Sequence, residues 1–264
     1  MLVDSHCHLD YLQRDGRDLT EVVSAARRVG VGTLVTICTK VTEFETIRAI
    51  AEDHDNVWCT VGIHPHEAES EPEITAERLI ELADHPKVVG IGETGLDYFY
   101  EHSPREAQQR SFRAHIAAAR ETGLPLIVHT RDADEDTVAI MEDEMGNGAY
   151  PGVIHCFSSS KWLAERSVAM GMAISISGIL TFKKADELRE AVAAVPAENL
   201  LVETDSPYLA PVPKRGKQNE PAFVVHTAER LAELKGMTGS ELATVTTDNF
   251  FRLFSKTVRP EGIA

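Results

Sequence analysis

The stretch REAQQRSFRAHIAAARETGLPLIVH, residues 105–129, contains one complete helix-to-strand unit of the fold. Residues Arg105–Thr122 predict a long helix that stops at Gly123, because glycine adopts the left-handed conformation that ends helices and a proline follows two residues later. The apolar run Leu126–Val128 then predicts a short buried strand. This strand leads directly into a polar residue, His129.

The same alternation of short apolar runs and helical periods extends in both directions along the chain. Predicted strands lie near Leu2–Asp4, Thr33–Cys38, Val57–Val61, Val88–Ile91, Leu126–Val128, Val153–Ile154, Ala173–Ser177 and Leu200–Val202. Predicted helices lie near Leu19–Val29, Thr42–Asp53, Ala76–Asp84, Arg105–Thr122, Asp134–Glu144, Ser160–Met170, Ala185–Val195, Val224–Lys235 and Ser240–Ser255. Such alternation is typical of a parallel sheet covered by helices.

Eight strand–helix repeats favour an α/β fold of the closed (β/α)₈ type, a TIM barrel. An open doubly wound sheet is the alternative, but no glycine-rich phosphate loop follows any of the strands. We expect a single domain over residues 1–264, a length that one barrel commonly has. The segment Pro207–Pro221 is rich in proline, lysine and glycine and predicts a long loop after the last strand, at the end of the barrel where such loops serve the active site.

Composition narrows the class of protein. The chain is 43% hydrophobic and 26% charged, which excludes a disordered or fibrous protein, and its formal net charge of −16 argues against a non-specific nucleic-acid binder. A polyanionic substrate would have to be met by a local basic patch or by bound cations. The four cysteines form no CxxC pair, and the sequence has no signal-peptide pattern and no apolar run long enough for a membrane helix. We therefore expect a cytoplasmic protein with reduced, buried cysteines.

Polar residues follow the predicted strands in a pattern that indicates metal binding. His6 and His8 are two residues apart on an extended segment, so both side chains face the same way, and Cys7 between them should turn toward the helices, as should Cys156. The remaining candidates follow strands four, five, six and eight, and they are Glu93, His129, His155 and Asp205. Each alone could be a structural residue, but together at one end of a barrel they would be costly without a cation.

Six nitrogen and oxygen ligands exceed what one open catalytic site uses, so we expect two divalent cations, with Mg, Mn or Zn as candidates. A plausible division places His6, His8 and Asp205 on one cation and His129 and His155 on the other, with Glu93 as the bridge. Two such cations hold a hydroxide that attacks the substrate. Asp205 is the expected proton acceptor, because a carboxylate that bridges two cations, as Glu93 would, loses basicity.

Substrate contacts are expected at the loops beside this centre. His64 follows strand three, and Arg131 follows His129 by two positions and is suited to gripping a phosphate. The densest basic clusters of the chain are Lys214, Arg215 and Lys217 in the long loop, and Lys183–Lys184 after strand seven. These charges suit phosphodiester anchors, although solvated surface charges would look the same. Tyr98 is a candidate for stacking on a base or for packing at the rim.

The chain resembles the TatD family of metal-dependent deoxyribonucleases. The matching motifs run from one end to the other: SHCHLD (5–10), GIHPH (62–66), GETGLDY (92–98), LIVHTR (126–131), VIHCFS (153–158), ETDSPYLAP (203–211), RGK and NEP (215–217 and 219–221) and NFFRLF (249–254). The resemblance implies a barrel, two divalent cations held by the six residues above, and a 3′-to-5′ exonuclease whose partner is DNA, preferably single-stranded. Ser159 and Gln218 depart from residues that the family often has there.

Other functions remain open from the sequence. A second hydrolase on the same two-metal site, such as an amidohydrolase or a D-aminoacyl-tRNA deacylase, is one alternative, and a non-catalytic barrel stabilised by metals is another. Related barrels often carry a carbamylated lysine at the end of strand four, where this chain has Glu93, and this difference favours the nuclease branch by resemblance. We expect a monomer or a weak oligomer.

Overall fold

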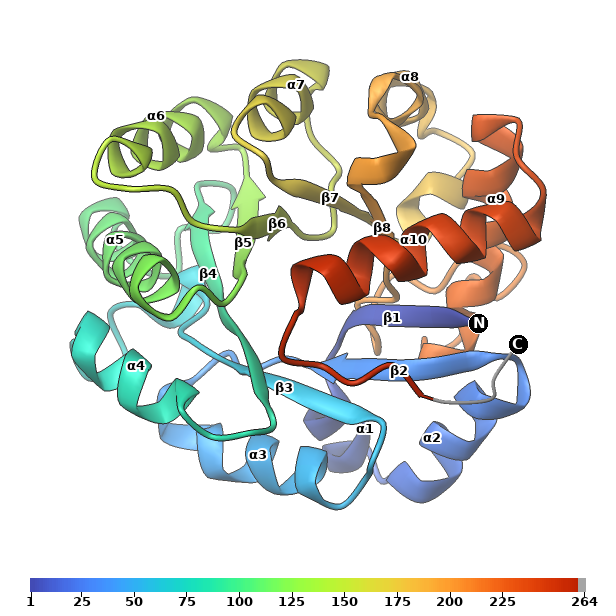
Figure 1. Ribbon diagram of the computed structural model, residues 1–264, viewed down its shortest axis with the longest axis horizontal. Coiled ribbons are helices and arrows are strands. Elements are labelled where there is room, and N and C mark those ends of the chain that lie inside the picture. Colours follow the sequence, from blue (N-terminus) through green and yellow to red (C-terminus); the bar gives the residue numbers. More distant parts are fainter. Residues whose placement is uncertain (261–264) are drawn as a thin grey trace.

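The computed structural model describes residues 1–260 and shows a ring of parallel strands surrounded by helices (Figure 1). The strands are β1 (Leu2–Cys7), β2 (Val31–Thr36), β3 (Val57–Val61), β4 (Val88–Asp97), β5 (Leu126–Arg131), β6 (Gly152–Ile154), β7 (Ala173–Ile176) and β8 (Leu200–Val202). They pair in chain order, each parallel to the next. The predicted (β/α)₈ barrel is therefore confirmed.

Helices return the chain between strands on the outside of the ring. They are α1 (Leu9–Arg14), α2 (Leu19–Arg28), α3 (Phe44–Glu52), α4 (Ala76–Ala83), α5 (Arg105–Thr122), α6 (Asp134–Met145), α7 (Lys161–Ala169), α8 (Asp186–Ala194), α9 (Val224–Lys235) and α10 (Gly239–Leu253). Short 3₁₀ turns lie at Val41–Glu43, Pro65–Glu67, Gly178–Thr181, Ala197–Asn199 and Pro221–Phe223. The expected single domain includes residues 261–264, which lie outside the described residues.

The ring closes where β1 meets the segment that follows β8. The backbone N–H of Asp205 donates to the carbonyl of His6 (2.9 Å), and the N–H of His8 donates to the carbonyl of Ser206 (2.8 Å). The buried carboxylate of Asp4 strengthens this seam by accepting from the backbone N–H and the hydroxyl of Thr204 at 2.8 and 2.6 Å. Three of the predicted metal ligands thus sit on the seam itself, and their spacing depends on barrel closure.

Helix α10 covers the amino-terminal end of the barrel, where it crosses the opening of the ring in Figure 1. Its side chains Phe250 and Phe254 stack at 4.5 Å between ring centroids and are almost fully buried. They pack against the first inward residues of the strands, among them Val35 and Ile127. Because apolar side chains fill this end, the opposite, carboxyl-terminal end is left for polar chemistry.

Two elements differ from the prediction. Strand β4 continues six residues beyond the expected end at Ile91, because Thr94–Asp97 pair with Val128–Arg131 of β5. A glycine at position 95 is needed there, since a Cβ would lie 2.0 Å from the carbonyl oxygen of His129. Helix α1 was not predicted, because its six residues are too few to show a helical period.

Within residues 1–260, the helices are too short or too polar to cross a membrane. The expected loop at Pro207–Pro221 is present up to the 3₁₀ turn that starts at Pro221. The four cysteines are free, in agreement with the prediction of reduced thiols.

Candidate metal centre

A cavity of about 780 Å³ opens at the carboxyl-terminal ends of the strands. Five of the six predicted metal ligands line it, and the sixth, His6, is almost fully buried beneath its floor. Those five are His8, Glu93, His129, His155 and Asp205. The structure therefore brings together all six side chains that the sequence pattern singled out, although they are spread over 200 positions of the chain.

The first group of ligand atoms surrounds one oxygen of Glu93. The Nε2 atoms of His6 and His8 lie 3.3 Å apart, and Oδ1 of Asp205 lies 3.6 and 3.4 Å from them. Oε2 of Glu93 is 3.4 Å from the His6 nitrogen and 4.0 Å from the His8 nitrogen. The four atoms belong to His6 in β1, to His8 just after that strand, to Glu93 in β4 and to Asp205 in the turn after β8.

The second group surrounds the other oxygen of the same carboxylate. Oε1 of Glu93 lies 2.8 Å from Nε2 of His155 and 3.1 Å from Nδ1 of His129, and these two nitrogens are 3.3 Å apart. Nε2 of His64 approaches the same oxygen at 3.4 Å. Glu93 is thus positioned to contribute one oxygen to each of two groups, as a bridging carboxylate does.

These spacings fit bound cations. Two ligand atoms about 2.1 Å from one tetrahedral ion lie roughly 3.4 Å apart, which is close to the separations within both groups. Imidazole nitrogens and carboxylate oxygens together suit Zn or Mn, and the carboxylates also suit Mg. The residues present therefore fit two divalent cations, with His6, His8 and Asp205 around one and His129 and His155 around the other.

Electrostatics within the cluster favour ionised carboxylates. Burial opposes ionisation of Glu93, but the charges of His155 and His64 and a hydrogen bond from His129 outweigh it and hold the pKa of Glu93 well below its usual range. Burial likewise opposes ionisation of Asp205, yet the hydrogen bond from His8 and the charge of His6 lower the pKa of Asp205. Both carboxylates are therefore negatively charged at neutral pH, as cation ligands must be.

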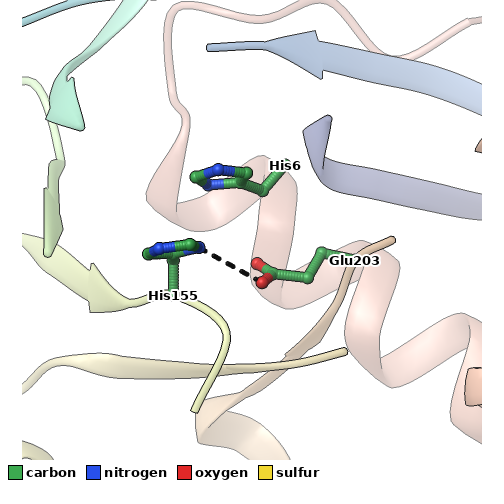
Figure 2. Close-up of side chains that lie close together, drawn as sticks. All are labelled: His6, His155 and Glu203. Atoms are coloured by element: carbon green, nitrogen blue, oxygen red, sulfur yellow. Dashed lines mark ion pairs between the residues drawn. The ribbon is translucent and has the colours of Figure 1, made fainter. Parts of the chain in front are cut away.

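Two further carboxylates hold the ligand histidines from behind. Oδ2 of Asp97 lies 3.2 Å from Nε2 of His129, and Oε1 of Glu203 lies 3.3 Å from Nδ1 of His155, each on the ring nitrogen that faces away from Glu93. Figure 2 shows the Glu203 carboxylate directed at the edge of the His155 ring, with the His6 ring stacked over His155. Such contacts fix the tautomer and orientation of a metal-binding imidazole.

His6, His155 and Glu203 themselves form a third cluster of possible ligand atoms. A neutral imidazole has only one free lone pair, and in both rings the Nε2 atom already faces Glu93. With Nε2 facing Glu93, the proton of a neutral His155 lies on Nδ1, the nitrogen that faces Glu203. We therefore assign Glu203 an orienting role rather than a ligand role.

Comparison with known proteins agrees with the metal-binding site that the geometry indicates. Residues 3–255 match the sequence profile of the family described as TatD related DNase. The chain belongs to this family. The metal-dependent hydrolase YcfH of Escherichia coli K12 is 46% identical over 255 residues, which cover 96% of this chain and 95% of that protein.

Two further relatives of this TatD family member extend the comparison. The protein named 3′-5′ ssDNA/RNA exonuclease TatD of Escherichia fergusonii is 36% identical over 90% of this chain and 93% of its own length. The crystal structure of YjjV, a TatD homologue from Escherichia coli K12, superposes with a TM-score of 0.89 at 29% identity, covering 96% of this chain and 98% of that one. The protein is a metal-dependent hydrolase of the TatD family.

In this TatD protein, some of the predicted substrate-contact residues line the cavity and others lie outside its lining. His64 and Arg131 line the cavity, and the Arg131 guanidinium lies 4.1 Å from the centroid of the Phe99 ring. The cluster of Lys214, Arg215 and Lys217 lies outside the lining of the cavity, further out on the long loop.

Of the two roles left open for Tyr98, the structure agrees with packing at the rim, because its hydroxyl donates to Asp136 at 2.7 Å while Arg105 covers its ring. One orientation inferred from the sequence is wrong. Cys156 lines the cavity instead of pointing toward the helices, since its backbone takes a positive φ of 43° two residues after the end of β6 and reverses the side chain. Burial raises the pKa of the Cys156 thiol well above its usual value, which disfavours the reactive thiolate. Cys7 is buried in the core as expected.

Asp97 and Glu203 were missed as ligand-orienting residues. Glu203 precedes Asp205 by two positions, the same spacing that relates His6 and His8, and this repeat was the available signal. Asp97 lies four residues after Glu93 on what proves to be one continuous strand. Residues two or four apart on a strand share a face, so a longer β4 in the prediction would have placed both carboxylates together.

Proposed function

We propose that this protein is a two-metal nuclease that hydrolyses phosphodiesters in single-stranded DNA, removing nucleotides in the 3′-to-5′ direction. The observation that carries the proposal is the position of Glu93, whose Oε1 and Oε2 face separate sets of histidines. Two cations held by these residues would supply the positive charge that in-line displacement at phosphorus requires. The exonuclease name of one relative supports the same reaction.

The six ligand residues would hold the cations, which supply positive charge to the phosphate and lower the pKa of the attacking water. Asp205 is the proposed proton acceptor. Its side chain is 15% exposed whereas that of Glu93 is 3% exposed, and it lines the cavity where the water would enter. Its lowered pKa keeps it ionised at neutral pH and ready to take the proton of the water.

His64 is proposed to donate a hydrogen bond to the phosphate. Its Nδ1 accepts from the backbone N–H of His66 at 3.1 Å, so in the neutral ring the proton resides on Nε2, which lies 3.4 Å from Oε1 of Glu93 in the lining of the cavity. Burial lowers the pKa of His64 to about 4, which keeps the ring neutral near pH 7. Arg131, exposed in the same cavity, is proposed to grip a second phosphate oxygen.

The basic residues outside the cavity are proposed to hold the strand further from the cleavage point. The Arg215 guanidinium lies 4.0 Å from the Phe182 ring, which places the long loop beside Lys183 and Lys184. This joins two basic clusters of an otherwise acidic chain into one surface. Replacing Lys214, Arg215 and Lys217 by alanine should raise KM for DNA and flatten its salt dependence, because fewer counterions are released on binding. An unchanged salt slope would remove this part of the proposal.

The direct test of the function uses protein stripped by a chelator and reloaded with Mg, Mn or Zn. We expect cation-dependent shortening of a 5′-labelled single-stranded oligonucleotide, one nucleotide at a time. D-aminoacyl-tRNA, a peptide amide and a phosphotriester serve as competing substrates. Faster turnover of any of these than of DNA would replace the nuclease by the other hydrolase, and no turnover of any substrate together with a metal-dependent melting temperature would indicate a purely structural role for the cations.

A further inference from the structure

Exposed aromatic side chains gather around the mouth of the metal cavity. Tyr100 and Tyr208 line it, and their side chains are 49% and 55% exposed. Tyr100 comes from the loop between β4 and α5, and Tyr208 from the loop after β8. An isolated exposed aromatic ring needs no explanation, but two that flank one polar cavity do, because each leaves apolar surface in water beside the candidate site.

The two tyrosines lie beside different residues of the candidate metal centre. The Tyr208 ring is 6.5 Å from the ring of His8, and Tyr208 lies three residues after Asp205, whose carbonyl accepts the backbone N–H of Tyr208 at 3.0 Å. The Tyr100 ring is 5.5 Å from the ring of His66. His66 in turn contacts Asp97, the residue behind His129, at 2.8 Å. One tyrosine therefore belongs to each group of metal ligands.

A positively charged side chain, that of Arg131, lies beside the ring of Tyr100. The Arg131 guanidinium lies 4.7 Å from its centroid and is exposed in the same cavity, and the ring of His102 stacks parallel to that of Tyr100 at 5.5 Å. An aromatic face next to a cation is the arrangement that holds a nucleotide, with the base on the ring and the phosphate on the charge. Stacking on a ring does not depend on the hydrogen-bonding groups of the base, so either tyrosine would accept any base.

We propose that Tyr100 and Tyr208 are base-stacking residues that hold one unpaired base on each side of the phosphodiester at the metal centre. This inference rests on the proposed nuclease function and adds how the site selects its strand. Bases within a duplex are stacked on both faces and paired at their edges, whereas an unpaired base offers a free face. The two rings thus select single-stranded ends by stacking, independently of sequence.

The experiment measures single-turnover cleavage of the first 3′ phosphodiester in two oligonucleotides of the same length. One is a normal single strand, and the other lacks the bases of its two 3′-terminal nucleotides. The variants are Tyr100→Ala, Tyr208→Ala and the corresponding phenylalanine replacements. Trp162→Ala is the matched control, because Trp162 is 45% exposed but lies outside the lining of the cavity.

Each alanine variant should weaken apparent binding of the normal strand at least about five-fold, the lower end of what one stacked base contributes. The same variants should leave cleavage of the abasic strand unchanged, and the phenylalanine variants and Trp162→Ala should behave as wild type on both strands. Equal losses on both strands, or no loss on either, would overturn the stacking role while leaving the nuclease intact. A wild-type protein that cleaves neither strand would overturn the proposed function, and the stacking inference with it.

Discussion

Nδ1 of His155 lies 3.3 Å from Oε1 of the buried Glu203, on the edge of the ring opposite Glu93. The glutamate also accepts the backbone N–H of Cys156 at 2.6 Å, so it fixes both the ring and the turn that carries it. Burial acts to lower the pKa of His155, but the charge of Glu93 and the contact and charge of Glu203 outweigh it and raise the pKa well above the usual value. A more basic imidazole is a stronger metal ligand.

Replacing Glu203 by glutamine should therefore weaken the binding of one cation by about 10- to 100-fold, because the amide retains the size and the contact to Cys156 but loses the charge. Titration calorimetry with Mn or Zn on chelator-stripped protein measures this change. Glu187→Gln, on the exposed face of α8, is the matched control. Wild-type affinity at both sites in the Glu203→Gln variant would show that the contact seen here does not tune the ligand.

Asp205→Asn should lower kcat by about 10²- to 10⁴-fold, the range that a general base contributes. The side chain keeps its size and stays at the seam held by the Asp205 N–H to His6 carbonyl bond, so the melting temperature of the metal-free protein should hardly change. Turnover of DNA and thermal unfolding are measured on the same preparation. A variant with near-normal kcat would assign proton transfer to another group.

His115 predicts a pH dependence of stability that is independent of the metal centre. Its Nε2 accepts the backbone N–H of Ile63 at 3.0 Å and its Nδ1–H donates to the carbonyl of Ser111 at 2.7 Å, so the folded protein requires the neutral ring. Burial lowers the pKa of His115 to about 4 from a usual value of 6.5. Between these values the unfolded chain binds a proton that the folded protein does not.

The stabilisation from a neutral His115 is consequently complete above about pH 6.5 and is lost as the pH falls toward 4, by up to about 3 kcal/mol. Denaturant unfolding of wild type and His115→Gln across pH 4–8 should show a shallower slope for the variant. His226→Gln, whose ring lies 3.3 Å from Glu229 at the surface of α9, should keep the wild-type slope. Parallel curves for wild type and His115→Gln would contradict the assignment.

Much of the fold is present in local patterns of the sequence. Residues Val57–Val61 and Arg105–Thr122 form the predicted strand and helix because their apolar or alanine-rich runs are bounded by clear stop signals. The second half of β4 was missed because GETGLD has two glycines and little intrinsic preference for a strand. It is a strand only because β5 supplies partners for it, which is tertiary information.

The meeting of the six candidate ligands in one place could be predicted because residues at the ends of parallel strands converge in a barrel. The orientation of Cys156 could not, since its positive φ follows from the turn that Glu203 holds across the barrel. The position of Lys214 and its neighbours outside the cavity lining could not be predicted from the sequence either. The course of a long loop is set by contacts such as that between Arg215 and the ring of Phe182. Residue type and spacing thus predicted which side chains converge at the centre better than they predicted where the residues around the cavity lie.

Phe250→Ala tests the separation between the stabilising and the chemical ends of the barrel. The ring is buried against Phe254 at the amino-terminal end, so its removal should reduce the free energy of unfolding by about 3–5 kcal/mol. Turnover by the folded variant at low temperature should remain near wild type, because the cavity lies at the other end. Denaturant unfolding and a DNA assay check the two parts, with Trp162→Ala as an exposed control for stability. A large fall in kcat without a loss of stability would show that the two ends are coupled.

The most direct test of the account is the number and position of the cations that Glu93 holds. Crystals soaked with Mn should show two anomalous difference peaks in each chain. One should lie among His6, His8 and Asp205 and the other between His129 and His155, with the Glu93 carboxylate between them. A single peak, or two peaks that do not share Glu93, would contradict the bridged two-metal centre.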